Sequence, residues 1–274
     1  MASRIPVLLM VPLAASALAA CAGSSSAALS SDPGPETTDV ERLGVEIVDT
    51  HPFDESSFTQ GLEVEPEGTL LVGTGQWGES RVYRRTLDGR EVLSRDIDGE
   101  HFGEGVTRHR DTVWQLTWQS GVAYRRDADT LEEVGRVRYP GEGWGLCSFQ
   151  DELLMSDGTS QLRRLEPATF REVERVSVTL DGAPVTGLNE LECVNGPEGP
   201  EVYANVFTDT DILRIDAATG RTTGVIDGST IPNNAAPDPD NVLNGIAAIP
   251  GSDHFYLSGK RWPDLYEVRF VPVS

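Results

Sequence analysis

The sequence has little positive charge for its length. Its 274 residues include 22 Lys and Arg against 44 Asp and Glu, which gives a formal net charge of −22. Such a surface repels the phosphates of nucleic acids and the headgroups of anionic lipids. We therefore expect no nucleic-acid partner, and any attachment to a membrane needs a cause other than a basic patch.

Histidine and cysteine are scarce as well. The four histidines are too scattered to suggest a zinc triad: His51, His101, His109 and His254. We therefore expect no metal and no other cofactor, although Asp-rich stretches at 208–211 and 237–240 leave a structural calcium open. Cys147 and Cys193 either form a disulfide or remain two buried thiols, because sequence alone does not supply the distance between them.

The N-terminal apolar run is too short to span a bilayer comfortably. Residues 5–18 follow Arg4 and precede small residues, which is the pattern of an export signal. The run Leu18-Ala19-Ala20-Cys21 resembles a bacterial lipobox, with ordinary signal cleavage and an incidental Cys21 as the alternative. We predict a signal peptide over 1–20, lipidation at Cys21 and a flexible Ser/Ala/Gly/Pro-rich tether over 21–43. The product would be an exported cell-envelope lipoprotein held to the membrane through its lipid alone.

From about Gly44 onward, short segments alternate apolar and polar residues between turn-forming residues. Segments 62–64, 69–72, 81–83 and 91–93 are examples, and pairs such as Asp88-Gly89 and Asp181-Gly182 separate them. This alternation indicates β-strands joined by tight turns, and no amphipathic helix of ordinary length competes with it. The pattern predicts an all-β domain over 44–274.

Similar dipeptides recur along this domain at intervals of 44, 40, 44 and 56 residues. They begin at Gln60, Glu104, Trp144, Leu188 and Asn244. A period of 40 to 50 residues with four short strands per unit is typical of propeller blades, so we predict a five-bladed β-propeller. A double-sheet sandwich would explain the strands but not the period. To close the ring, residues 44–48 and 265–270 would share one blade.

Glycines beside these positions would let the backbones approach a crowded axis, so that neighbouring side chains point into a central channel. Several segments of the chain then resemble the glutamine cyclotransferase family of plants and bacteria. They are Phe58–Leu62, Phe102–Gly105, Leu116–Trp118, Gly143–Leu146, Leu188–Glu192, Ala204–Phe207 and Ser258–Pro263. The resemblance extends from about Val45 to Val268, and seven segments in the same order make it specific. It implies a five-bladed propeller that does not need zinc for catalysis.

The resemblance also implies roles for individual residues. Glu104 would be the general acid and base, and Asn189 and Lys260 would complete the catalytic set. Lys260 would stabilise an oxyanion, or would instead pair with Glu104 or Asp264. The substrate-binding set would be Phe58, Gln60, Phe102, Trp118, Trp144 and Phe207, although tryptophan is expected where this chain has Phe207.

The expected reaction is the conversion of an N-terminal glutamine of a peptide or protein to pyroglutamate, with release of ammonia, by a monomeric enzyme. The free α-amine attacks the γ-carboxamide of the same residue, so proton transfer and stabilisation of the oxyanion are the main catalytic tasks. Two alternatives stay open. One is a metal-dependent, lactonase-like hydrolase with Glu104, Asn189 and Asn244 as ligands, and the other is a propeller that only binds a ligand.

Overall fold

The structure is a computed structural model that describes residues 40–273. Within these residues the chain forms β-strands joined by turns and loops, and it contains no helix long and apolar enough to cross a membrane. The predicted signal peptide, Cys21 and nearly all of the predicted tether lie outside the described residues.

Three antiparallel sheets of four strands follow one another along the chain. The first contains β2 (Thr59–Val64), β3 (Leu70–Thr74), β4 (Arg81–Arg85) and β5 (Glu91–Asp96). The second contains β6 (Gly103–His109), β7 (Thr112–Thr117), β8 (Val122–Asp127) and β9 (Glu133–Arg138). The third contains β10 (Leu146–Ser148), β11 (Leu153–Met155), β12 (Gln161–Glu166) and β13 (Arg171–Ser177). A hairpin follows, formed by β14 (Thr179–Leu180) and β15 (Ala183–Pro184). Its predicted Asp181-Gly182 turn has positive φ at both residues, 51° and 80°.

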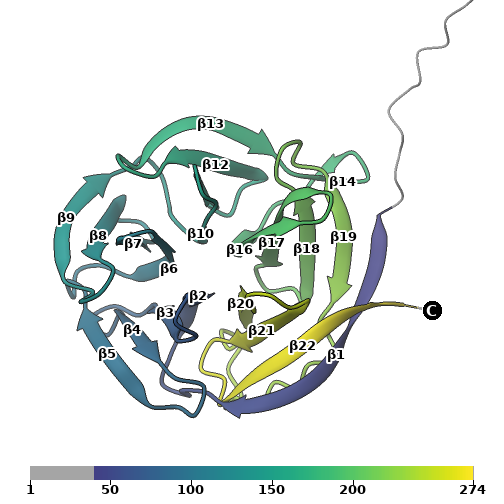
Figure 1. Cartoon of the computed structure of the whole chain (residues 1–274), viewed down its shortest axis with the longest axis horizontal. Helices are drawn as coiled ribbons and strands as arrows, with labels where there is room; N and C mark the ends of the chain where they lie inside the picture. The colour runs from purple at the N-terminus through teal and green to yellow at the C-terminus, as the bar shows by residue number, and fades with distance from the viewer. Residues whose placement is uncertain (1–39, 274) are drawn as a thin grey trace, which may run out of the picture. The chain divides into compact units, whose positions relative to one another are not determined.

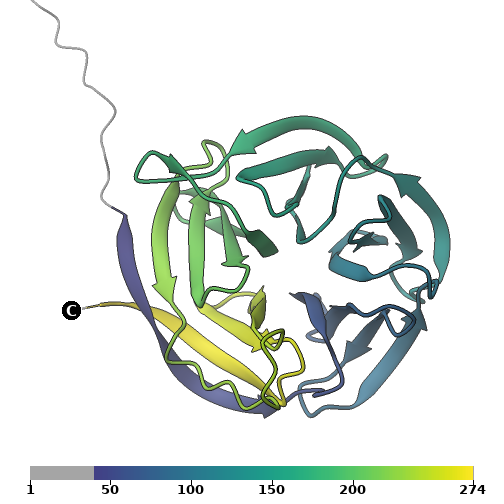
Figure 2. The ribbon, with the colours of Figure 1, turned by 180° about the vertical axis from the view of Figure 1, so that it is seen from behind.

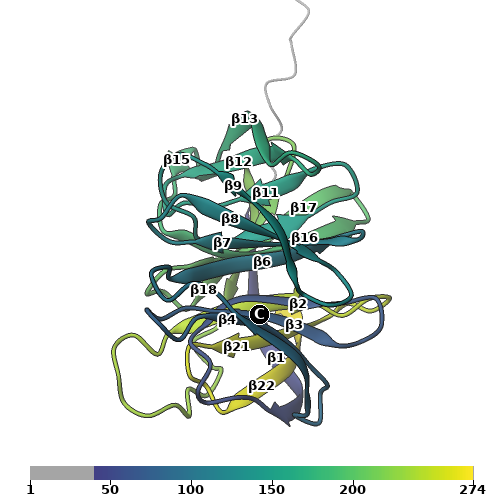
Figure 3. The ribbon, with the colours of Figure 1, turned by 90° about the vertical axis from the view of Figure 1, so that its left-hand side faces the viewer.

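An eight-stranded sheet completes the ring of sheets. Its order is β16 (Leu188–Gly196), β17 (Gly199–Val206), β18 (Asp211–Asp216), β19 (Thr222–Asp227), β1 (Glu41–Pro52), β22 (Asp264–Pro272), β21 (His254–Gly259) and β20 (Leu243–Ala248). Figure 1 shows strands β2, β6, β10, β16 and β20 nearest the centre, and Figure 2 shows the same arrangement from behind. In the edge-on view of Figure 3, the long connection from β19 to β20, in yellow-green, loops out beyond the strands.

The first and last strands of the described chain, which the sequence predicted to share one blade, lie in one sheet and pair directly with each other. β1 runs antiparallel to β22, with Val45 opposite Phe270. β1 also pairs in parallel with β19, a contact that the sequence did not suggest. Because β1 begins at Glu41 and Leu43 is buried, the predicted tether boundary at 43 is three residues too late. The composition of the tether does not indicate that Leu43 is buried. Burial of this apolar side chain stabilises the inclusion of residues 41–43 in the sheet.

The innermost strands approach one another closely at the axis. A β-carbon on Gly105 would lie 2.6 Å from the backbone nitrogen of Leu146, and one on Gly145 would lie 2.0 Å from the carbonyl oxygen of Asn189. Only glycine fits such spacing. Glu190 of β16 connects to β2 and β20 at the same axis. Its carboxyl oxygens accept hydrogen bonds from the backbone N–H groups of Leu62 and Ile246 at 3.1 and 2.9 Å.

Apolar side chains fill the spaces between neighbouring sheets. Four of the five buried clusters in the described residues join strands of two neighbouring sheets, represented by the pairs Leu71 and Val106, Trp114 and Leu153, Leu154 and Val202, and Leu62 and Leu265. The fifth, with Ile212 and Phe255, packs between β18 and β21 of the eight-stranded sheet. Strands covered on both faces are therefore buried throughout, as in β3, whereas the outer strand β13 is mostly exposed.

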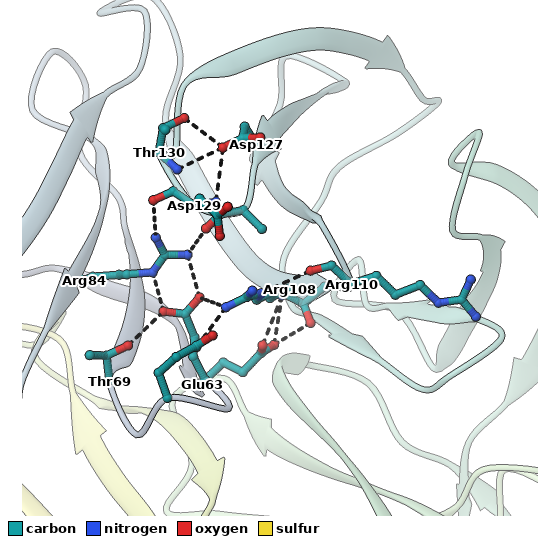
Figure 4. Close-up of polar contacts among 12 residues, drawn as sticks. Glu63, Thr69, Arg84, Arg108, Arg110, Asp127, Asp129 and Thr130 are labelled. Carbon is teal, nitrogen blue, oxygen red and sulfur yellow. Dashed lines mark hydrogen bonds and ion pairs between the residues drawn. The ribbon is translucent and has the colours of Figure 1, made fainter.

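Two cross-links join neighbouring sheets near the core. Cys147 of β10 and Cys193 of β16 form a disulfide, which settles the alternative that the sequence left open. Arg84 of β4 and Arg108 of β6 both contact the buried Glu65 carboxylate, and Figure 4 shows the two arginines converging from their strands. Arg84 also donates a hydrogen bond to the Asp129 carbonyl oxygen in the second sheet.

Candidate active site

A pocket of about 250 Å³ lies where the innermost strands begin. All nine residues predicted for catalysis or substrate binding line it: Phe58, Gln60, Phe102, Glu104, Trp118, Trp144, Asn189, Phe207 and Lys260. Gln76 and Asp240 line it as well and were not predicted. These residues come from segments up to 202 positions apart, from Phe58 to Lys260, so the ring of sheets alone brings them together.

Glu104 lies near the start of β6, where the pairing with β7 changes register between Gly103 and Val106. This irregularity takes Glu104 out of the regular strand ladder, as bulges beside functional sites do. The residue is 4% exposed. Burial raises its pKa well above the ordinary value, with a smaller opposing effect from the Lys260 charge and a further raising effect from Glu142.

Gln60 donates the hydrogen bond that Glu104 receives, from Nε2 to Oε1 at 3.0 Å. The side-chain oxygen of Gln60, Oε1, in turn accepts a hydrogen bond from Asn244 Nδ2 at 3.0 Å. The same Asn244 nitrogen also donates to the main-chain carbonyl oxygen of Thr59. Because an amide has one donor end and one acceptor end, Asn244 makes Gln60 present its donor to Glu104. Asn244 therefore supports Gln60 rather than lining the pocket.

Lys260 is buried, and its ammonium nitrogen lies 4.8 Å from the ring centre of Phe58 and 5.0 Å from that of Phe207. Both distances are typical of cation–π contacts. Burial lowers the pKa of Lys260, and the charges of Glu104 and Asp240 oppose that effect. The predicted alternative partner Asp264 instead accepts hydrogen bonds from Asn234 and Tyr266.

Asn189 is 3% exposed, and its main-chain carbonyl oxygen accepts a hydrogen bond from Ser156 Oγ at 2.6 Å. Within residues 40–273, no protein hydrogen bond engages its side-chain amide. That amide faces the pocket with a donor and an acceptor that a bound molecule can use.

Aromatic rings form the pocket walls. Phe102 makes edge-to-face contacts with Phe58, Trp118 and Trp77, with ring centres 5.7 to 6.0 Å apart. On the other side, the rings of Trp144 and Phe207 lie 5.4 Å apart. The buried Glu104 carboxyl group lines the same pocket as these rings.

Sequence reasoning missed three residues of this site. Gln76 precedes Trp77 in the Gly75–Gly78 turn, and its φ of 133° is unusual for a residue with a side chain. Asp240 lies in the connection before β20. Glu142 binds the indoles of Trp118 and Trp144, and only its position two residues before a predicted site residue could have indicated it.

Across the described part of the chain, no three His, Cys, Asp or Glu side chains come together as a metal-ligand group. Of the three ligands considered for a metal-dependent hydrolase, Glu104 accepts from Gln60 and Asn244 supports Gln60. Asn189 alone has a free amide at the pocket.

Fold and site together define the class of protein: an all-β enzyme with a buried carboxyl group in a pocket at the centre of a ring of sheets. A family model described as "Glutamine cyclotransferase" matches residues 14–270, and the chain belongs to this family. The chain is 33% identical over 235 residues to a glutaminyl-peptide cyclotransferase of Arabidopsis thaliana, covering 84% of this chain and 72% of the relative. The crystal structure of Myxococcus xanthus glutaminyl cyclase superposes with a TM-score of 0.80 at 36% identity, covering 86% of this chain and all of that one.

Proposed function

We propose that the pocket converts the N-terminal glutamine of peptides or proteins to pyroglutamate. The neutral α-amine attacks the γ-carboxamide carbon, a ring C–N bond forms, the bond to the carboxamide nitrogen breaks, and ammonia leaves. No water is consumed. A terminal α-amine has a pKa of about 7.7–8.0, so a substantial part of it is neutral near pH 8.

Glu104 carries the proton in this proposal. It takes a proton from the attacking amine and gives one to the departing nitrogen, which requires both of its protonation states to be accessible. Its raised pKa brings the two states closer in free energy at neutral pH. Gln60 orients the carboxyl group through its hydrogen bond.

The other residues bind and orient the substrate. The Lys260 ammonium stabilises the oxyanion that develops at the carboxamide oxygen, and the Asn189 amide holds the polar groups of glutamine. The aromatic walls pack against the flat carboxamide and exclude water that would hydrolyse it. Holding amine and carboxamide in contact supplies much of the acceleration, since effective molarities of about 10⁵–10⁸ M are known for such intramolecular reactions.

A single observation carries this proposal: a buried carboxyl group with a raised pKa and a buried lysine share one pocket with an amide that has no protein partner. The test is ammonia release from a short Gln-initiated peptide, with the product identified by mass spectrometry. Pyroglutamyl product is expected, and folded wild-type protein that releases no ammonia would refute the proposal. An Asn-initiated peptide is the control, because its ring closure would give a strained four-membered ring.

The identity of the product also distinguishes the proposed reaction from the two alternative functions. A hydrolase would leave N-terminal glutamate rather than pyroglutamate, and a metal-dependent one would lose activity on exhaustive chelation. A binding module would retain the peptide without releasing ammonia.

We also propose that the ring has five blades, with the eight-stranded sheet counted as two. One blade would be β16–β19, and the other would combine β20–β22 with β1. The apolar cluster that contains Ile212 and Phe255 supports this division, because it packs between these two halves as the other clusters pack between separate sheets.

The lipidation of Cys21 and export to the cell envelope are proposals that rest on the lipobox pattern. A monomeric state is a separate proposal. Cys21→Ala is expected to move the protein from the membrane fraction to the soluble fraction. Retention of that variant at the membrane would refute the anchor. Size-exclusion chromatography coupled to light scattering tests the monomer.

A further inference from the structure

Glu142 joins the two tryptophans of the pocket. It lies between β9 and β10, and its Oε2 atom accepts hydrogen bonds from Trp118 Nε1 at 2.8 Å and from Trp144 Nε1 at 3.0 Å. Its other oxygen accepts from Gln119 Nε2 at 3.1 Å. Trp118 follows β7 of the second sheet, whereas Trp144 precedes β10 of the third, so one carboxylate ties together walls from two sheets.

These bonds determine how the rings stand. An indole has a single N–H donor, so a partner for that donor selects one ring orientation. A carboxylate forms charge-assisted bonds, which are roughly twice as strong as neutral ones. Both tryptophans are only partly buried, and packing alone leaves them freer than the fully buried Trp114. The bonds from Glu142 therefore set the separation between Trp118 and Trp144.

Glu142 also acts on the electrostatics of the pocket. Burial tends to raise its own pKa, but the hydrogen bonds from Trp144, Gln119 and Trp118 outweigh burial and lower that pKa. Its negative charge raises the pKa of Glu104, whereas the charge of Lys260 lowers it. Tyr139 is a further titratable neighbour, with a pKa raised to about 12 by burial and, more weakly, by Glu104. Asp240 lines the same pocket and raises the pKa of Lys260. Two carboxyl groups in one site are thus driven toward different protonation states.

We propose that Glu142 is a positioning residue of this site: its ionised carboxylate holds Trp118 and Trp144 as the walls of the slot that receives the substrate carboxamide, and keeps a negative charge beside Glu104. This inference deepens the proposed function and rests on it for the identity of the substrate. Glu142 does not touch the reacting atoms. It acts through the two indoles and through its charge.

Two substitutions separate the two effects. Glu142→Gln keeps an oxygen that can accept both indole N–H groups but removes the charge, so KM should change less than about threefold. The acidic limb of the pH profile of kcat/KM should move to lower pH, because Glu104 loses a neighbour that raises its pKa. Glu142→Ala removes both effects. Its KM should rise on the order of tenfold, since two charge-assisted bonds are lost, with the same shift of the acidic limb.

Glu174→Gln is the matched control. Glu174 lies on the outer strand β13 with a 67% exposed side chain, and its substitution removes the same unit of charge. It should leave both KM and the pH profile unchanged. If the Glu142 variants match this control in KM and in the acidic limb, the proposal is overturned. A rise in KM without a shift of the limb would refute the electrostatic role.

A measurement without turnover keeps the inference separate from the proposed function. The indole N–H signals of Trp118 and Trp144, assigned by Trp→Phe variants in NMR spectra, should move in Glu142→Ala while those of the other tryptophans stay. Unmoved signals would overturn the positioning role. Moved signals in a protein that never releases ammonia would leave the positioning role standing and refute the proposed function instead.

Discussion

Glu65 and Glu104 are two buried glutamates with opposite surroundings. Glu65 is completely buried between the first and second sheets, where Arg84 and Arg108 contact its carboxylate and Thr69 donates a further hydrogen bond at 3.1 Å. Figure 4 shows Arg84 in turn reaching toward Asp129 in the next sheet. Glu104 is almost as buried, but in the described structure its carboxyl group receives one hydrogen bond, from the neutral Gln60.

The difference shows how the same side chain serves two purposes. A buried carboxylate with two cationic partners links the strands that carry those partners. A buried carboxyl group that lacks such a direct partner has its pKa raised, and its proton becomes available for transfer. Burial alone therefore does not decide what a glutamate does. Glu190 is as buried as Glu104 and, among the described residues, also lacks an ion-pair partner, but its carboxyl oxygens accept hydrogen bonds from two backbone N–H groups rather than from a pocket side chain. Four predictions test this contrast, in order of decreasing effect.

Glu104→Gln should separate activity from stability most strongly. Loss of a general acid and base lowers kcat by about 10²- to 10⁴-fold. The free energy of unfolding should not fall, because a neutral amide is easier to bury than a carboxyl group and still accepts from Gln60. Steady-state ammonia release and urea unfolding measure the two quantities. Near wild-type kcat would remove Glu104 from the mechanism.

Glu65→Gln should give the reverse result. Two arginines lose the charge that compensates them, so the free energy of unfolding should fall by about 3–5 kcal/mol. The kcat of the folded protein should stay within about twofold, since Glu65 is not among the residues of the catalytic pocket. Glu67→Gln is the control: its 60% exposed side chain pairs with Arg108, and the expected loss is below about 1 kcal/mol. Equal losses in both variants would contradict the contrast.

The Cys147–Cys193 disulfide is a second contact between sheets whose loss should lower stability rather than activity. Replacing Cys147 and Cys193 together by alanine opens a connection between residues 46 positions apart. The free energy of unfolding should fall by about 2–4 kcal/mol, because the unfolded chain regains conformational freedom. Urea unfolding of the double variant measures this loss, and ammonia release should persist below the transition. A loss of kcat without a loss of stability would show that the disulfide shapes the pocket directly.

The pH dependence of stability should change least. Between the unfolded glutamate pKa of about 4.3 and its raised folded pKa, Glu104 keeps a proton that the unfolded chain has lost. Its contribution therefore makes stability fall as pH rises through this window, by up to about 1.4 kcal/mol per unit. Glu104→Gln should reduce that slope in unfolding experiments across the window. Glu63, whose pKa burial raises to about 7, would retain part of it. An unchanged slope would argue against a raised pKa at Glu104.

Much of the molecule could be predicted from local patterns. Alternating apolar residues and turn pairs predicted the all-β fold, and the repeating dipeptides predicted the innermost strands. Residues 44–48 and 265–270, predicted to share one blade, lie on neighbouring strands of one sheet. The predicted site residues, from Phe58 to Lys260, all reach one pocket. The family resemblance made this last prediction possible, because no periodicity identifies the side chains that face a channel.

Other features depended on contacts between distant segments. The sequence determined the strands and their turns, since side-chain alternation and backbone preferences act over a few residues. Only the tertiary structure decided that Cys147 would meet Cys193, that β1 would also join β19, and that Glu142 would bind two tryptophans of different sheets. It also decided the contrast between Glu65 and Glu104. Burial and charge pairing depend on which residues the closed ring brings within a few ångströms, and that distance is set by packing rather than by position along the chain.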